Sequence, residues 1–176
     1  VKDENVKQTA ADVSSSPKHT KGIRIVRIIP NTSRVIVVTD AYVHTFSSST
    51  GELIMAVAVA EDPFLRPHCV AVSPDSRFLL VASGDMVTVQ VAHDLKVVQI
   101  LCRYASPESL AELRTAGALH VRGHDGAECL PDGTVCIDKR ITAAQLSPNG
   151  DVAFVGTEGG ELLAFLVQLN WDRTIL

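Results

Sequence analysis

A short turn motif recurs along the chain, and its spacing constrains the fold more than any other feature. Ser73-Pro74-Asp75-Ser76 and Ser147-Pro148-Asn149-Gly150 are two copies, and Pro30-Asn31-Thr32-Ser33 is a looser third. The first two prolines lie 44 residues apart and the last two lie 74 apart. A period of roughly 40 to 45 residues is typical of stacked supersecondary units. The longer interval exceeds one period by about 30 residues, which predicts an insertion between the second and third copies.

Each copy contains short apolar segments separated by Gly, Pro and small polar residues. Runs of this kind predict strands joined in an antiparallel meander. The first copy has candidate strands at 23–29, 34–39, 42–46 and 53–59; the second at 68–72, 77–82, 86–91 and 97–101; the third at 141–146, 151–156 and 161–167. We therefore expect an all-β fold built from four-stranded antiparallel units.

The sequence around these turns resembles the WD40 repeat. Residues 73–85 and 147–157 resemble its first turn and second strand, and residues 43–54 resemble the end of a repeat, with Phe46 where the family has its Trp. Gly123-His124 resembles the family's Gly-His dipeptide. The resemblance covers most of residues 22 to 170 and implies a β-propeller, in which each repeat forms one blade. We expect blades at about 22–60, 67–102 and 141–176, a flexible polar tail at 1–21, and an insertion at about 103–140.

The repeats also depart from the family pattern. No Trp-Asp dipeptide lies on a third strand, because Trp171-Asp172 comes after Phe165 has taken that position. The resemblance gives structural repeat positions, which in the family include a hydrogen-bond network that fixes the blade: Thr39, Asp40, Phe46, Ser83, Asp85, Thr157 and Glu158. Propellers have roughly four to eight blades, so three form an incomplete ring. We expect further blades in the same parent chain or in a partner, with self-association the less favoured route.

The insertion contains a predicted helix and the candidate metal ligands. Ser106 is a predicted N-cap with Pro107 as the first helical residue, and Gly117 ends the helix. Four potential zinc ligands follow: His120, His124, Cys129 and Cys136. Their spacing matches no common zinc module, so the competing interpretation is that Cys136 packs inward on a strand and the histidines are solvated or structural.

Two further patterns bear on catalysis. The carboxylates of Asp40, Asp85 and Glu158 recur at equivalent sites and could bind a cation or act as general acid and base. Their recurrence in every repeat favours a structural role instead. The sequence contains no Gly-x-Ser-x-Gly, Walker A or Gly-x-Gly-x-x-Gly motif. We predict no catalytic residue and no cofactor.

Charge and cysteine usage limit the partners and the location. A net charge of −4 makes a nucleic-acid partner unexpected, and no apolar run is long enough to span a bilayer. Four scattered cysteines favour free thiols and a cytoplasmic location, whereas a Cys129–Cys136 disulfide would fit an extracellular protein. The first residue is Val1 rather than Met, which suggests a cut or processed chain from which a signal could have been lost.

These observations favour a protein-interaction scaffold module, part of a larger WD40 propeller protein or complex, over an enzyme. The insertion and the blade edges would contact other proteins. One alternative is a ligand-binding or enzymatic propeller of the lactonase or dehydrogenase kind, which needs a polar funnel and usually a metal. Another is a regulatory sensor domain of a larger signalling or trafficking protein.

Overall fold

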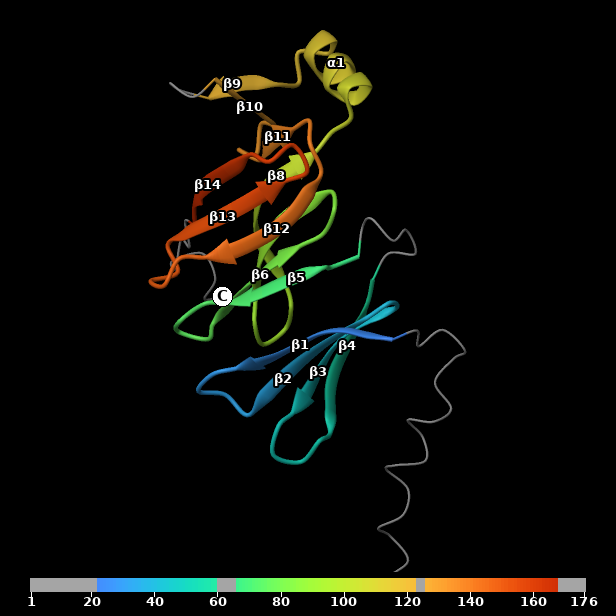
Figure 1. Cartoon of the computed structure of the whole chain (residues 1–176), viewed down its shortest axis with the longest axis vertical. Helices are drawn as coiled ribbons and strands as arrows, with labels where there is room; N and C mark the ends of the chain where they lie inside the picture. Colours follow the sequence, from blue (N-terminus) through green and yellow to red (C-terminus); the bar gives the residue numbers. More distant parts are fainter. Residues whose placement is uncertain (1–21, 60–65, 123–125, 168–176) are drawn as a thin grey trace, which may run out of the picture.

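The computed structural model describes residues 22–59, 66–122 and 126–167, and they form three β-sheets with one short helix (Figure 1). The first sheet contains β1 (Ile23–Ile29), β2 (Arg34–Thr39), β3 (Tyr42–Ser47) and β4 (Leu53–Ala58) in that order. The second contains β5 (Cys69–Val72), β6 (Phe78–Ala82), β7 (Met86–Val91) and β8 (Val97–Tyr104), extended by strands of the insertion. The third contains β12 (Ile141–Leu146), β13 (Val152–Thr157) and β14 (Leu162–Leu166). The expected antiparallel β fold is confirmed.

The insertion contains more regular structure than the sequence indicated. Its helix, α1 (Pro107–Thr115), begins as predicted, because the Ser106 side chain accepts a hydrogen bond from the Ser109 amide at 3.2 Å. The residues after the helix, predicted to be a loop, form β9 (His120–Arg122), β10 (Ala127–Cys129) and β11 (Val135–Ile137). β11 pairs in parallel with β8, and β10 and β9 follow it outward.

The three sheets stack face to face and enclose two apolar cores. One core lies between the first and second sheets, and the other lies between the second and third sheets and extends to the insertion. Because side chains alternate along a strand, each sheet has two faces. We call the face directed at the preceding sheet the N-face and the face directed at the following sheet the C-face.

The recurring turns are held by serine hydroxyl groups. In the β5–β6 turn the Ser73 hydroxyl accepts a hydrogen bond from the Phe78 amide at 2.9 Å, and in the β12–β13 turn Ser147 accepts one from the Val152 amide at 3.0 Å. The sharp bend requires positive φ angles, 61° at Ser76 and 83° at Gly150. The sequence similarity of the two turns therefore reflects shared geometry.

The described sheets do not form a closed ring. The third sheet has three strands in the described part of the chain, and residues 168–176, the remainder of the expected third blade, lie outside that part. The predicted tail at 1–21, the Gly123-His124 dipeptide and Trp171-Asp172 also lie outside it. Among the described helices, none has the length and apolar character needed to cross a membrane.

Candidate protein-interaction surfaces

The N-face of the first sheet carries apolar residues at positions that are buried or half-buried in the other two sheets. Strand register identifies the equivalent pairs: Val26 with Val37, Val70 with Val81, and Ala144 with Val155. Val70 and Ala144 are 3% and 5% exposed because the preceding sheet covers them, whereas Val26 is 49% exposed. The neighbouring residue Ile28 is also exposed, although its equivalent Leu146 is buried. This face has the composition of an internal contact but lies at the surface.

The C-face of the third sheet shows the same relationship at the opposite end of the stack. Ile36, Leu80 and Phe154 occupy equivalent positions on the second strands, paired with Thr45, Val89 and Ala164 respectively. Ile36 and Leu80 are 0% and 1% exposed, and Phe154 is 39% exposed. Leu162 on the adjacent strand is also exposed. The two outer sheets therefore each leave an apolar face uncovered by the described residues.

An aromatic row crosses the exposed N-face. The rings of Tyr42, His44 and Phe46 follow one another along β3, with centroids 5.5 and 5.7 Å apart. Burial lowers the pKa of His44 below its ordinary value, which favours the neutral imidazole.

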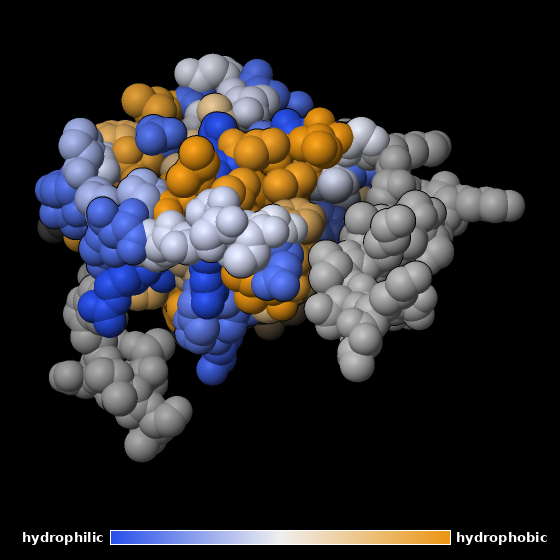
Figure 2. Space-filling view, turned by 90° about the horizontal axis from the view of Figure 1, so that it is seen from below, coloured by the Kyte–Doolittle hydropathy of each residue, from blue (hydrophilic) through white to orange (hydrophobic). Residues whose placement is uncertain are grey.

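The two rows of paired residues across this face contain no Lys, Arg, Asp or Glu: Val26, Val37, His44 and Ala56 in one row, and Ile28, Val35, Phe46 and Leu53 in the other. Seen from below, the end of the molecule formed by the first sheet shows a hydrophobic patch (Figure 2).

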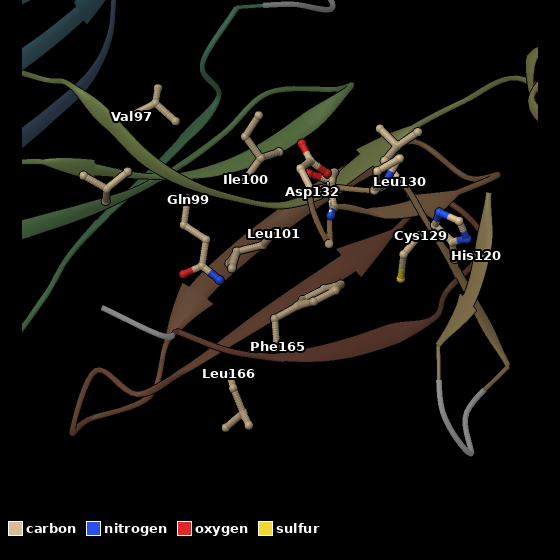
Figure 3. A pocket seen from close by; sticks show the side chains of 14 residues that line it. Val97, Gln99, Ile100, Leu101, His120, Cys129, Leu130, Asp132, Phe165 and Leu166 are labelled. Carbon is tan, nitrogen blue, oxygen red and sulfur yellow. Dashed lines mark hydrogen bonds between the residues drawn. The ribbon is translucent and has the colours of Figure 1, made fainter. Parts of the chain in front are cut away.

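A groove of about 710 Å³ lies between β8, the β10–β11 hairpin and β14. Leu101 and Phe165 lie near its middle, and His120 and Cys129 lie toward one end (Figure 3). In the first two sheets a fourth strand pairs with the third strand, but β14 pairs only with β13 in the described residues. The groove therefore runs beside an open strand edge, and its lining mixes apolar residues with polar ones such as Gln99, Asp132 and Thr134.

The helix of the insertion is fixed to the neighbouring hairpin by a bidentate ion pair. The Arg114 guanidinium donates hydrogen bonds of 2.6 and 2.7 Å to the two carboxylate oxygens of Glu128 on β10. These bonds hold the pKa of the Glu128 carboxyl below its ordinary value. A hollow of about 580 Å³ separates the helix from β8 and β11, with Tyr104, Leu113 and Cys136 among its lining residues. The helix and the hairpin of the insertion are thus anchored to each other, and the insertion is not an irregular loop.

The predicted zinc ligands do not converge in the described residues. His120 pairs with Cys129 across β9 and β10, so these two side chains share a face. Cys129 pairs with Val135, which places Cys136 on the opposite face of the hairpin. Both cysteines are free thiols. The described part of the chain contains no group of three or more His, Cys, Asp or Glu residues that could hold a metal, and His124 lies outside it.

The hydroxyl residues at the recurring positions close the turn after each second strand. Thr39, Ser83 and Thr157 are all buried. The Thr39 hydroxyl accepts a hydrogen bond from the Tyr42 amide at 3.0 Å, and Ser83 accepts one from the Met86 amide at 3.2 Å. The amide of Thr157 donates one to the Glu161 carbonyl at 3.0 Å.

The acidic residues at the recurring positions have separate local partners. Asp40 forms ion pairs with Arg24 and Arg66. Asp85 accepts a hydrogen bond from the Ser83 hydroxyl, and Glu158 accepts one from the Arg140 amide at 3.3 Å. Phe46, the remaining repeat position, lies in the aromatic row. Asp85 and Glu158 are thus used close to their own sheets, whereas Asp40 also contacts Arg66 in the segment that leads into the second sheet.

Sequence reasoning missed the particular residues that make the end faces apolar. It anticipated further blades beside those of this chain, but named none of Val26, Ile28, Phe154 and Leu162. The signal was present for Val26, Ile28 and Phe154, because aligning the copies on their turns places these three residues at positions that are apolar in every copy. No family model and no curated protein matches the chain in the comparisons made.

Proposed function

We propose that this chain is a protein-interaction scaffold of the WD40-like propeller type, whose end faces pack against further β-sheets of the same kind. The observation that supports the proposal is the exposure of Val26 and Phe154, whose equivalents Val70 and Leu80 are buried between sheets. An exposed apolar face of this sort is typical of a protein-binding surface. The sheets that cover these faces would come from outside residues 22–167.

Energetic considerations favour covering the faces. Full burial of a Val, Ile, Leu or Phe side chain contributes roughly 1.5–3 kcal/mol. Val26, Ile28, Phe154 and Leu162 are all substantially exposed and would each recover part of that free energy on contact with another sheet. The rows of paired N-face residues also avoid the desolvation of carboxylates and of Lys or Arg side chains, because they contain none.

A β-sheet is the partner that matches the geometry best. The exposed rows follow the strand register and continue the arrangement already present at the two internal contacts. Face-to-face sheet packing interdigitates side chains from both inner faces. A helix would contact a single stripe of residues and leave much of the four-stranded face uncovered.

Site-specific photocrosslinking in cells that express the protein naturally tests this proposal. A benzophenone side chain replaces Phe154 on one end face or Val26 on the other, with the exposed Lys96 in the β7–β8 turn as the matched control position. We expect both end-face positions to crosslink to peptides with the alternating apolar pattern of a strand, identified by mass spectrometry. Crosslinking no greater than at Lys96, or crosslinking only to polar or helical segments, would contradict the proposal.

A further inference from the structure

We infer that a second copy of this chain supplies the covering sheets, with the C-face of its third sheet packed on the N-face of the first sheet of the other copy. The inference rests on the proposed function and names the partner for the same two faces. It departs from the expectation that self-association is the less favoured route. The reason is that a single chain carries both an uncovered C-face and an uncovered N-face, the two kinds of face that pack together inside the chain.

The internal contacts show which faces fit together. Between the first and second sheets, Ile36 and Val38 of a C-face pack in one core with Val70 of an N-face. Between the second and third sheets, Leu80 of a C-face packs with Ala144 of an N-face. The chain thus forms the same C-face to N-face contact twice. The C-face of the third sheet and the N-face of the first are the two faces left without a partner in the described residues.

The exposed N-face is chemically close to the one that is already covered. Its Val26–Val37 pair has the same residue types as the Val70–Val81 pair of the second sheet. The neighbouring pair, Ile28 with Val35, corresponds to Val72 with Leu79, so one β-branched aliphatic and one further aliphatic residue meet in both sheets. A C-face that packs on the N-face of the second sheet would therefore meet similar side chains on the N-face of the first sheet.

The exposed C-face balances a large residue with small ones. Phe154 is larger than its equivalents Ile36 and Leu80, while Gly156 stands where the other sheets have Val38 and Ala82. Tight packing tolerates such exchanges when the total volume is kept. Phe154 and Gly156 together are therefore close in volume to Leu80 and Ala82 of the second sheet, whose C-face fills an internal contact.

The symmetry of this contact allows a closed pair of copies. A contact between two different faces is head-to-tail, and it forms a ring if the rotation between copies closes. Two copies contribute six sheets, which lies within the range of roughly four to eight found in propellers. Closure would cover both end faces of both copies, so we expect a dimer rather than an open filament.

Complementary variants test the inference by sedimentation analysis of mass in solution. Ile28→Glu disrupts the N-face and Leu162→Glu disrupts the C-face; the side chains they replace are 69% and 72% exposed in one copy, so the fold should tolerate both. Val121→Glu on β9, at 71% exposure, is the matched control because it lies on neither end face. Circular dichroism checks that every variant keeps its β structure.

We expect the unmodified chain and Val121→Glu to have the mass of two copies, and each end-face variant alone to have the mass of one. Mixing Ile28→Glu with Leu162→Glu should restore a 1:1 dimer, since one intact C-face then meets one intact N-face. A monomeric unmodified chain, dimers of either end-face variant alone, or a mixture that stays monomeric would each overturn the inference. The two proposals can be told apart by the crosslinks. Crosslinks from Phe154 to a strand of another protein would support the scaffold proposal and exclude the second copy as the partner.

Discussion

Gly150 in the β12–β13 turn lies directly against the ring of Pro74 in the β5–β6 turn. A Cβ atom at Gly150 would lie 2.8 Å from Cδ of Pro74, closer than such atoms approach in proteins. The φ angle of Gly150 is +83°, a conformation that residues with a side chain rarely adopt. The glycine therefore serves both the bend of its own turn and the contact between two sheets.

Replacing Gly150 with Ala should destabilise the protein by about 2–4 kcal/mol, because the left-handed conformation and the forced displacement of Pro74 both add cost. Gly160→Ala is the matched control, since its φ is +79° and an added Cβ meets nothing within 4 Å. It should cost only about 1–2 kcal/mol. Urea unfolding measures both values, and equal losses would show that the contact with Pro74 contributes nothing.

Ser76→Gly should stabilise the protein by about 0.5–1 kcal/mol. Ser76 holds the equivalent turn position with a φ of +61°, and its buried hydroxyl has no hydrogen-bond partner among the described residues. Glycine relieves the strain and removes the unpaired group. Asn31→Gly, at a φ of +57°, is the control, and its gain should be smaller because Asn tolerates this conformation. A melting temperature that falls for Ser76→Gly would contradict this account.

Replacing two threonines on the β2–β3 hairpin with Val should change the free energy of unfolding by different amounts. Thr39→Val removes the hydroxyl that bonds both the amide and the carbonyl of Tyr42, and should cost about 1–2 kcal/mol. Thr45 is completely buried and its hydroxyl has no partner among the described residues, so Thr45→Val should be neutral or slightly stabilising. Chemical denaturation of the two variants makes the comparison, and a larger loss for Thr45→Val would refute the assigned roles.

The recurring turns and their strands could be predicted because they depend on local sequence. The Ser-Pro pairs at 73–74 and 147–148, followed by a position that needs a positive φ, specify a tight bend wherever they occur. The N-cap at Ser106 was predictable for the same reason, since the hydroxyl bonds an amide only three residues away.

The strands of the insertion could not be predicted in the same way. β9, β10 and β11 have three residues each, too few for a pattern of alternation to be recognised. β11 forms because Val135 meets Cys102 of β8, a partner far away in the sequence. The groove beside β14 was missed for a related reason: Leu101 and Phe165 come from different sheets, and only the stacking brings them together.

Acidification should weaken the fold through His44 before the carboxylates protonate. Burial lowers the pKa of His44 from its ordinary 6.5, so the unfolded chain binds the proton more tightly than the folded chain. Its contribution is complete above pH 6.5 and is lost as the pH falls from 6.5 toward the lower pKa of the folded state. Burial lowers the pKa of His68 in the same direction, partly offset by a hydrogen bond with the backbone of Thr142.

His44→Phe should therefore flatten the fall in unfolding free energy below pH 6.5 while leaving the contribution of His68. Glu128 gives a separate signal, because Arg114 lowers the pKa of its carboxyl and stability is lost only as the pH falls below the ordinary carboxyl value of 4.5. Urea denaturation from pH 8 down to about pH 3 separates the two windows by their position. An unchanged slope between pH 6.5 and pH 5 in His44→Phe would show that His44 does not couple protonation to folding.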